Sequence, residues 1–315
     1  RDSTTTETLT KIANSASNGK PLGADIMEID QAAHRLYSGD RNAGGLDIYD
    51  VSTPLAKFVK VIPLPGGSAS GVATAPDIKE VFAAGGKGVV VVNVDPSSPK
   101  ADTVIATVPP AGPGGNDELD YDAKDHRVYV TDVADKTVEA IDTTTNKVVK
   151  TFPNQGEGLE QPRYDSGDGM FYINVRGANQ IAQFDPSKDT FVKTFDVVDK
   201  CAPGGFAINV KTQLAMLGCQ QQHVAFWDLK AGKVASTSDQ NGRADAVFYS
   251  PKADRFFFAG SGFHLGPAMG IFDGAGKFIT NVPTTVASHQ VAFDETNNIV
   301  YTAAGPLVSF PLPKK

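Results

Sequence analysis

The sequence has little of several residue types that mark particular functional classes. Its 315 residues include one Trp, two Cys and five His. No apolar run approaches the length of about 18 residues that a membrane-spanning helix needs, so we expect no membrane span. The formal net charge is -7, opposite in sign to the basic surfaces that bind nucleic acid, and we expect no nucleic-acid partner.

Several catalytic motifs are missing as well. The sequence contains no Gly-x-Ser-x-Gly nucleophile elbow. The segment "GGKG" at residues 85–88 lacks the strand–loop–helix setting of a phosphate-binding loop and is typical of a hairpin turn. Trp227, the sole Trp, lies in an apolar strand and is expected in the core. Neither a tryptophan platform nor an arrangement of the cysteines favours a quinone-dependent dehydrogenase, which is therefore the weakest hypothesis.

The residues that are present predict a folded, turn-rich chain. Charged residues make up 21% and hydrophobic residues 41%, which is typical of globular proteins. The 31 Gly and 20 Pro predict many turns. The sequence opens at "RDSTTTETLTKIA" without an initiator Met or an apolar leader. This fits either a mature chain trimmed of a leader, and so a secreted or periplasmic protein, or an arbitrary boundary.

A repeated unit runs along the whole chain. Each unit has a short apolar run, a polar turn, a middle strand such as "HRLYSGD" or "HRVYVTD", a loop, and in most units a closing strand that ends in Asp, such as "LDIYD" or "VEAID". The second apolar position of each middle strand serves as an anchor, with Ala215 as the alternative in the fifth unit. The anchors are Tyr37, Phe82, Tyr129, Tyr172, Met216, Phe257 and Tyr301, and successive steps are 45, 47, 43, 44, 41 and 44 residues.

Four short alternating strands per unit predict an all-β fold, a seven-bladed β-propeller that forms a single domain over residues 1–315. The seventh unit ends after about three strands. The N-terminal "TETLTKIAN" is similar to fourth strands such as "NKVVKTFPN". We therefore predict that the N-terminal strand closes the last blade and removes an open sheet edge. We expect a monomer.

The units resemble the YVTN family of seven-bladed propellers, most closely in "VYVTDVADKTVEAIDTTTNKVVKTF" at residues 128–152. This resemblance implies the fold and an extracytoplasmic location, and says little about activity. More distant similarity is to propellers of the SMP-30/gluconolactonase type and to streptogramin (virginiamycin B) lyases, which are metal-dependent enzymes that use the central channel.

Equivalent positions of propeller blades form rings around the central axis, and ligand sites gather at the channel mouth. The position just before each innermost strand lies twelve residues ahead of the anchor. The residues there are Asp25, Ser70, Asp117, Glu160, Gly204, Asp245 and His289. The next position holds Ile26, Gly71, Glu118, Gln161, Gly205, Ala246 and Gln290. A register slip of one residue keeps Glu118 and Gln161 as candidates.

Several carboxylates brought within about 4–6 Å of one another need a compensating charge. A divalent cation would supply it. Oxygen ligands with one imidazole suit Mg²⁺, Ca²⁺ or Mn²⁺ better than Zn²⁺. The predicted ligands come from Asp25, Asp117, Glu118, Glu160, Asp245 and His289. Solvated loops that hold no ion would explain the same polar ring.

The resemblance to the two enzyme families is partial at this ring. The SMP-30-like enzymes carry metal-binding carboxylates at comparable positions, but their Glu-Gly-Pro motif is present only as "EQP" at Glu160. Streptogramin lyases use histidine and glutamate near their metal, and here His289 and Glu160 occupy plausible positions. Neither signature is intact.

Loops that follow the middle strands should face the same mouth. His289, Glu160 and His264 are the candidates for acid–base catalysis. The candidates for substrate binding are Arg176, Asp40, Phe263 and Asn174. Arg176 could hold a substrate carboxylate through its guanidinium fork, or pair with a neighbouring carboxylate. The sixth-unit loop "GSGFHLGPAMG" is about three residues longer than its equivalents and is either a pocket wall or a plain surface loop.

Cys201 and Cys219 stand at the two ends of the fifth blade's first strand pair, which should meet at one face. A disulfide would indicate an oxidising compartment; two free thiols are the alternative. The leading hypothesis for function is a secreted enzyme that acts on a small organic molecule at the channel mouth. The chemistry would be metal-assisted lactone or ester hydrolysis, or a lyase or isomerase step. The alternative is a non-catalytic extracytoplasmic propeller that binds a ligand or protein.

Overall fold

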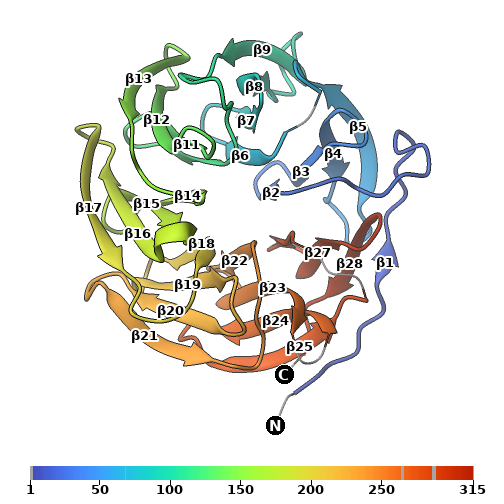
Figure 1. The fold of residues 1–315 in the computed structure, drawn as a ribbon. Coiled ribbons are helices and arrows are strands. Elements are labelled where there is room, and N and C mark those ends of the chain that lie inside the picture. The colour runs from blue at the N-terminus through green and yellow to red at the C-terminus, as the bar shows by residue number, and fades with distance from the viewer. Residues whose placement is uncertain (1–2, 68, 264–265, 286–288, 315) are drawn as a thin grey trace.

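Seven four-stranded antiparallel sheets stand in a ring about a central axis, which confirms the predicted seven-bladed β-propeller (Figure 1). The structure, a computed structural model, describes residues 3–67, 69–263, 266–285 and 289–314 and leaves the side chain of Phe263 undescribed. Within these residues helix is confined to one 3-10 turn, η1 (Arg176–Ala178). No helix of the described chain is both long and apolar enough to cross a membrane.

Each blade takes four strands that are consecutive in the sequence, except the last. Blades one to three contain β2 (Met27–Asp30), β3 (Arg35–Asp40), β4 (Gly45–Asp50) and β5 (Lys57–Pro63); β6 (Gly71–Ala75), β7 (Glu80–Gly85), β8 (Gly88–Asn93) and β9 (Thr103–Val108); and β10 (Leu119–Asp122), β11 (Arg127–Asp132), β12 (Thr137–Asp142) and β13 (Lys147–Phe152). Blades four and five contain β14 (Leu159–Asp165), β15 (Met170–Val175), β16 (Gln180–Asp185) and β17 (Thr190–Asp196); and β18 (Pro203–Asn209), β19 (Leu214–Cys219), β20 (Val224–Asp228) and β21 (Lys233–Ser238). Blades six and seven contain β22 (Val247–Ser250), β23 (Arg255–Phe263), β24 (Gly266–Asp273) and β25 (Phe278–Pro283); and β26 (Ala292–Asp294), β27 (Ile299–Ala303), β28 (Leu307–Pro311) and β1 (Thr10–Lys11).

The register of the two inner strands is the same in every blade. Each anchor pairs with the residue nine positions before it: Tyr37 with Glu28, Phe82 with Ala73, Tyr129 with Asp120, Tyr172 with Arg163, Met216 with Ala207, Phe257 with Phe248, and Tyr301 with Ala292. In the fifth blade Met216 keeps this offset, so it is the correct anchor and Ala215 is not. The common register allows positions to be compared from blade to blade.

The Asp that ends most closing strands is a turn residue. Asp50, Asp142 and Asp185 each accept a hydrogen bond through Oδ1 from the backbone N–H two residues later, at 2.8, 2.8 and 2.9 Å. Aspartate stabilises tight turns in this way. The repeated Asp therefore serves the scaffold and contributes nothing to the channel mouth.

The N-terminal strand closes the seventh blade, as the sequence predicted. β1 pairs antiparallel with β28, with Thr10 opposite Ser309. The Ile12 N–H donates to the Leu307 carbonyl at 2.9 Å, and the Ile12 side chain is buried. The N-terminal segment runs along the outside of the last blades (Figure 1). The outer edge of β28 is thereby covered, and the ring closes through chain segments from both ends of the sequence.

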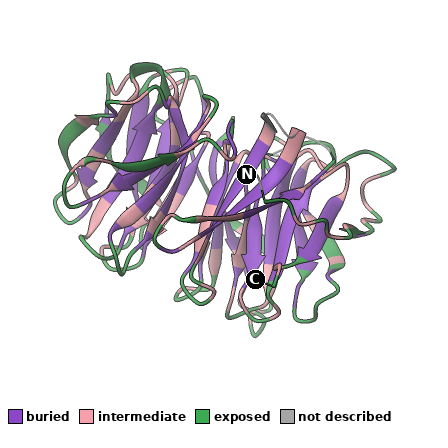
Figure 2. Ribbon diagram, turned by 90° about the horizontal axis from the view of Figure 1, so that it is seen from below, coloured by how far each residue is buried: buried purple, intermediate pink, exposed green. Residues whose placement is uncertain are grey.

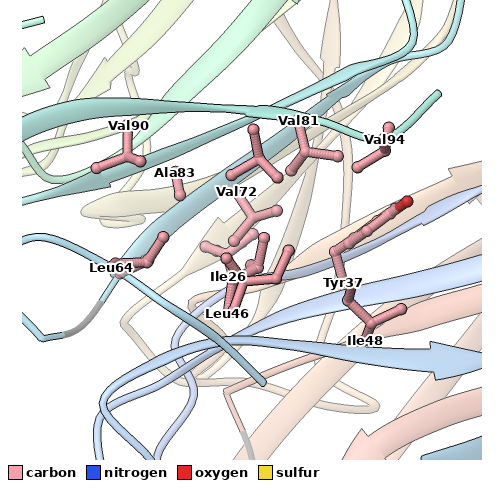
Figure 3. Close-up of a cluster of buried hydrophobic side chains, with 13 residues drawn as sticks. Ile26, Tyr37, Leu46, Ile48, Leu64, Val72, Val81, Ala83, Val90 and Val94 are labelled. Atoms are coloured by element: carbon pink, nitrogen blue, oxygen red, sulfur yellow. The ribbon is translucent and has the colours of Figure 1, made fainter. Parts of the chain in front are cut away.

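Apolar side chains fill the space between neighbouring blades. One cluster joins Ile26, Tyr37, Leu46, Ile48 and Leu64 of the first blade to Val72, Val81, Ala83, Val90 and Val94 of the second (Figure 3). Buried residues run through the inner strands of the blades, while exposed residues gather in the loops above and below and in outermost strands such as β13, β17 and β21 (Figure 2). The loops at the two faces are thus free to carry function while interblade packing fixes the ring.

Two features of the fifth and sixth blades bear on the predictions. Cys201 and Cys219 form a disulfide with their Cα atoms 4.6 Å apart, as predicted. The long sixth-blade segment is largely not a loop: β23 and β24 extend into a long hairpin with a register shift between Gly260 and Phe263. The predicted sites at Phe263, as a side chain, and at His264 lie outside the described residues.

Candidate functional site

Two carboxylates of the predicted mouth ring pair with arginines of their own blades. Asp25 contacts Arg41, and Glu160 Oε1 lies 2.9 Å from Arg176 Nη1. In both blades the carboxylate stands twelve residues before the anchor and the arginine four residues after it. The backbone N–H groups of Arg41 and Arg176 donate to the carbonyls of Gly23 and Gly158, at 2.9 and 3.0 Å. The shared strand register therefore places each carboxylate next to the arginine of its own blade.

A third pair joins the sixth and seventh blades. His289 Nδ1 lies 3.0 Å from Asp245 Oδ2. The Asp245 Oδ1 atom accepts a hydrogen bond from Gln220 Nε2, which reaches it past Gly204, where an added Cβ would lie 2.9 Å from that nitrogen. Gln220 occupies the same position after its anchor as Arg41 and Arg176. Asp245 is thus held from both sides and orients the imidazole.

The arginine or histidine is the more exposed member of each pair. The side chains of Arg41, Arg176 and His289 are 49%, 43% and 51% exposed, against 32%, 14% and 41% for Asp25, Glu160 and Asp245. A molecule that arrives at the mouth therefore meets donors first, with the carboxylates behind them.

Asp117 and Glu118 both lie near enough to the other acids of the mouth for those charges to shift their pKa values. Burial and the charge of Asp25 raise the pKa of Asp117. Burial, followed by the charges of Glu160 and Asp117, raises the pKa of Glu118 well above its usual range. Glu118 Oε2 is buried and has no hydrogen-bond partner among the described residues. In both acids, burial and neighbouring negative charge favour the protonated form.

Glu160 is the most perturbed of the paired acids. Burial raises its pKa to about 8, although the positive charge of Arg176 opposes the rise, and Asp245, Asp117 and Asp25 add to it. Burial likewise acts to raise the pKa of Asp245, but the hydrogen bond and charge of His289, the hydrogen bond from Gln220 and the charge of Arg176 together outweigh burial. The pKa of Asp245 therefore lies below the usual value. The hydrogen bond to Asp245 raises the pKa of His289. The mouth thus contains a carboxyl group with a raised pKa, Glu160, and one with a lowered pKa, Asp245.

A second charged layer, which sequence reasoning missed, lies deeper along the axis. Glu28, Asp120 and Arg163 stand nine residues before their anchors. Arg163 Nη1 lies 3.8 Å from Glu28 Oε1, and burial raises the pKa of Glu28 to about 7. A cavity of about 120 Å³ adjoins Glu28, Arg163 and Gln161. Counting back nine residues from each anchor in the sequence would have found this layer.

Two of the predicted substrate-binding residues are buried, form hydrogen bonds with backbone groups and so stabilise the fold. Asp40 is buried, and its Oδ1 accepts N–H groups of Gly23, Asn42 and Ala43 at 3.2, 2.9 and 3.2 Å. Asn174 is buried and donates through Nδ2 to the carbonyls of Gly204 and Gly205 at 2.7 and 3.0 Å. Asn174 thereby ties the fourth blade to the mouth of the fifth. Of the four predicted substrate-binding residues, Arg176 is the one with an exposed polar group at the mouth.

Several of the predicted metal ligands at the mouth contact other side chains. Among the described residues, no three His, Cys, Asp or Glu side chains are grouped so that they could hold one. Three of the predicted ligands, Asp25, Glu160 and Asp245, already contact a cationic side chain. A metal would have to displace at least one of these partners to gain a third carboxylate.

Comparison of the chain with protein-family models and with curated proteins gives no match. The structure thus bears out the propeller architecture that the resemblance implied, and function has to be argued from the residues of the mouth.

Proposed function

We propose that the channel mouth binds a small organic anion and carries out acid–base chemistry on it. The observation that supports this is the consistent outward placement of Arg41, Arg176 and His289 over their carboxylate partners. Arginine guanidinium groups bind carboxylates through parallel N–H donors. A substrate carboxylate is therefore the group that these side chains suit best.

His289 is the proposed general base. With Nδ1 directed at Asp245, the imidazole keeps Nε2 for the substrate or for a water molecule, the arrangement that makes histidine an effective proton acceptor. Glu160 lies in the same ring and Glu118 stands at the next position, and either could return the proton. Hydrolysis of a lactone or ester that carries a carboxylate, or proton abstraction next to one in a lyase or isomerase step, would use these groups in the same roles.

The disulfide and the resemblance to YVTN propellers support an extracytoplasmic setting, and we propose a secreted or periplasmic protein that works as a monomer. A divalent cation at Asp117 and Glu118 is the second candidate cofactor arrangement, because these acids form no ion pair within the described chain. The same mouth could also bind its ligand without turning it over.

The test uses a panel of lactones and esters that carry a carboxylate, with binding measured by calorimetry and turnover by product formation. Arg176→Gln should weaken binding at least about 10-fold, since a charge-assisted bond contributes roughly 1.5–3 kcal/mol. His289→Gln should abolish turnover and keep binding. Lys136→Gln is the matched control, because Lys136 forms an exposed pair with Glu157 at 2.6 Å. Equal binding by the Arg176 variant and the control would refute the proposal, and binding without turnover would favour the non-catalytic alternative.

A further inference from the structure

A pocket of about 510 Å³ opens at the opposite end of the innermost strands. Its walls are Tyr121 of β10 and Tyr164 of β14, and Pro76, Asp77, Lys124 and Ser166 complete it. Asp117 precedes β10, whereas Tyr121 lies near its end and Lys124 follows it. The pocket is therefore separated from the mouth by the length of the strands, and nothing in the proposed mouth chemistry uses it.

Both tyrosine rings are fixed by the blades behind them. The Tyr121 ring stacks on Phe82 at 5.9 Å between centroids, and its hydroxyl donates to Asp77 Oδ2 at 3.0 Å. The Tyr164 ring packs on Phe171 at 5.3 Å. Each ring thus packs against a core phenylalanine and also lines the pocket. Such rigid aromatic walls bind a ligand with little loss of side-chain freedom.

Carboxylates surround the two rings. Burial and then Asp77 and Asp122 raise the pKa of the Tyr121 hydroxyl, and burial followed by Asp122 and Asp125 raises that of Tyr164. Asp77 is exposed, and the structure gives its Oδ1 atom no partner within the described residues. Lys124 is the opposing cation on the rim, and it forms no ion pair with the described chain. The local charge is therefore negative.

We propose that this pocket binds an organic cation, with its ammonium group between the two tyrosine rings and next to the Asp77 carboxylate. Aromatic faces attract cations through the ring quadrupole, and such sites hold primary or quaternary ammonium groups. A carboxylate beside the rings adds direct charge attraction. A neutral sugar or an anion would lack this match, and an anion would also face repulsion from Asp77.

The first experiment compares choline with 3,3-dimethylbutan-1-ol, its uncharged isostere, by protein-observed NMR titration of the full chain. Choline should bind at least about 5-fold more tightly than the isostere, the ratio expected from a cation–π contact of about 1 kcal/mol. Equal binding of the two compounds, or no binding of choline at tens of millimolar, would overturn the proposal.

Point variants then test whether choline binds in this pocket. Asp77→Asn should weaken choline binding, and Lys124→Ala should strengthen it, because these two side chains have opposite charges on one rim. The matched control is Asp254→Asn, which alters the Tyr249 hydroxyl bond to Asp254 Oδ1 at 2.7 Å in the sixth blade and should leave binding unchanged. If Lys124→Ala weakens binding, or if Asp254→Asn acts like Asp77→Asn, the assignment is wrong. Because Asp77 and Lys124 are exposed, neither change should prevent folding.

Discussion

His289 and Asp245 meet across the joint between the sixth and seventh blades, with 3.0 Å between Nδ1 and Oδ2. The hydrogen bond raises the pKa of His289. Asp245→Asn should therefore lower that pKa, because the negative partner is lost while the burial that opposes protonation remains. The measurement is an NMR titration of the His289 ring. Asp199→Asn, which alters the other His–Asp contact, at His223, should not move it; an equal effect of both variants would show that the shift is not local.

A second prediction concerns Asp47, which is fully buried beneath the N-terminal segment. Its Oδ2 accepts a hydrogen bond from Asn14 Nδ2 at 3.0 Å, and burial together with Asp40 raises its pKa to about 8. Below pH about 4 the native and unfolded states both hold the proton. Between pH 4 and 8 the unfolded chain releases it first, so the native state loses stability as the pH rises.

Asp47→Asn should flatten this dependence, because the amide cannot ionise and can still bond to its neighbours. Between pH 5 and pH 8, the fall in unfolding free energy should be smaller in the variant by at least about 1 kcal/mol. Urea unfolding at the two pH values measures it. Asp50→Asn at the exposed end of the same strand is the control; a fall as steep in Asp47→Asn as in that control would contradict the protonated state of Asp47.

The disulfide should stabilise both the fold and the mouth. Cys201 and Cys219 are 18 residues apart in sequence and flank Gly204, while Gln220, which holds Asp245, follows the second cysteine. Closing a loop of this length contributes about 3 kcal/mol through the unfolded state. Replacement of both cysteines by alanine, or reduction, should lower the unfolding free energy by about that amount. Unchanged unfolding under reducing conditions would contradict this role.

Metal dependence follows from the arginine pairs. Because the Arg176 guanidinium contacts Glu160, this carboxylate is not available as a metal ligand. The melting temperature should therefore not change with EDTA or with added Mg²⁺, Ca²⁺ or Mn²⁺. Arg176→Gln frees Glu160 next to Asp117 and Glu118, and in that variant Ca²⁺ should raise the melting temperature by linkage. Arg41→Gln is the matched variant on the other side of the ring. A chelator-sensitive melting temperature in the unaltered protein would instead support the predicted metal site.

The anchors show how much of the fold could be predicted from the sequence. Their spacing predicted the blades, because strand pairing repeats the same register in each unit. The similarity of "TETLTKIAN" to fourth strands predicted the closure by β1, and the positions of Cys201 and Cys219 in the fifth unit predicted the disulfide. The pairing of Arg176 with a neighbouring carboxylate was one of its two predicted roles and is the one that the structure shows. The pair of Arg41 and Asp25 was not predicted, although Arg41 and Arg176 both stand four residues after an anchor. The metal site predicted from the acids and His289 stays a prediction, and a count of the positions after the middle strands would have added Arg41 as the partner of Asp25. The contact of His289 with Asp245 could not be predicted from positions within one blade, because the two residues belong to neighbouring blades.

The closure of the ring gives the last prediction. Ile12 is 2% exposed and packs in the cluster with Leu36, Tyr49 and Leu307 where the last blade meets the first. Ile12→Ala should lower the unfolding free energy by about 2–5 kcal/mol, the cost of a cavity in a core that cannot collapse. The neighbouring Lys11→Ala, at an exposed position of β1, should change it by less than about 0.5 kcal/mol. Chemical denaturation measures both variants. If the N-terminal strand only lies on the surface, the two substitutions will have the same small effect, and the propeller would then have to be stable with the edge of β28 uncovered.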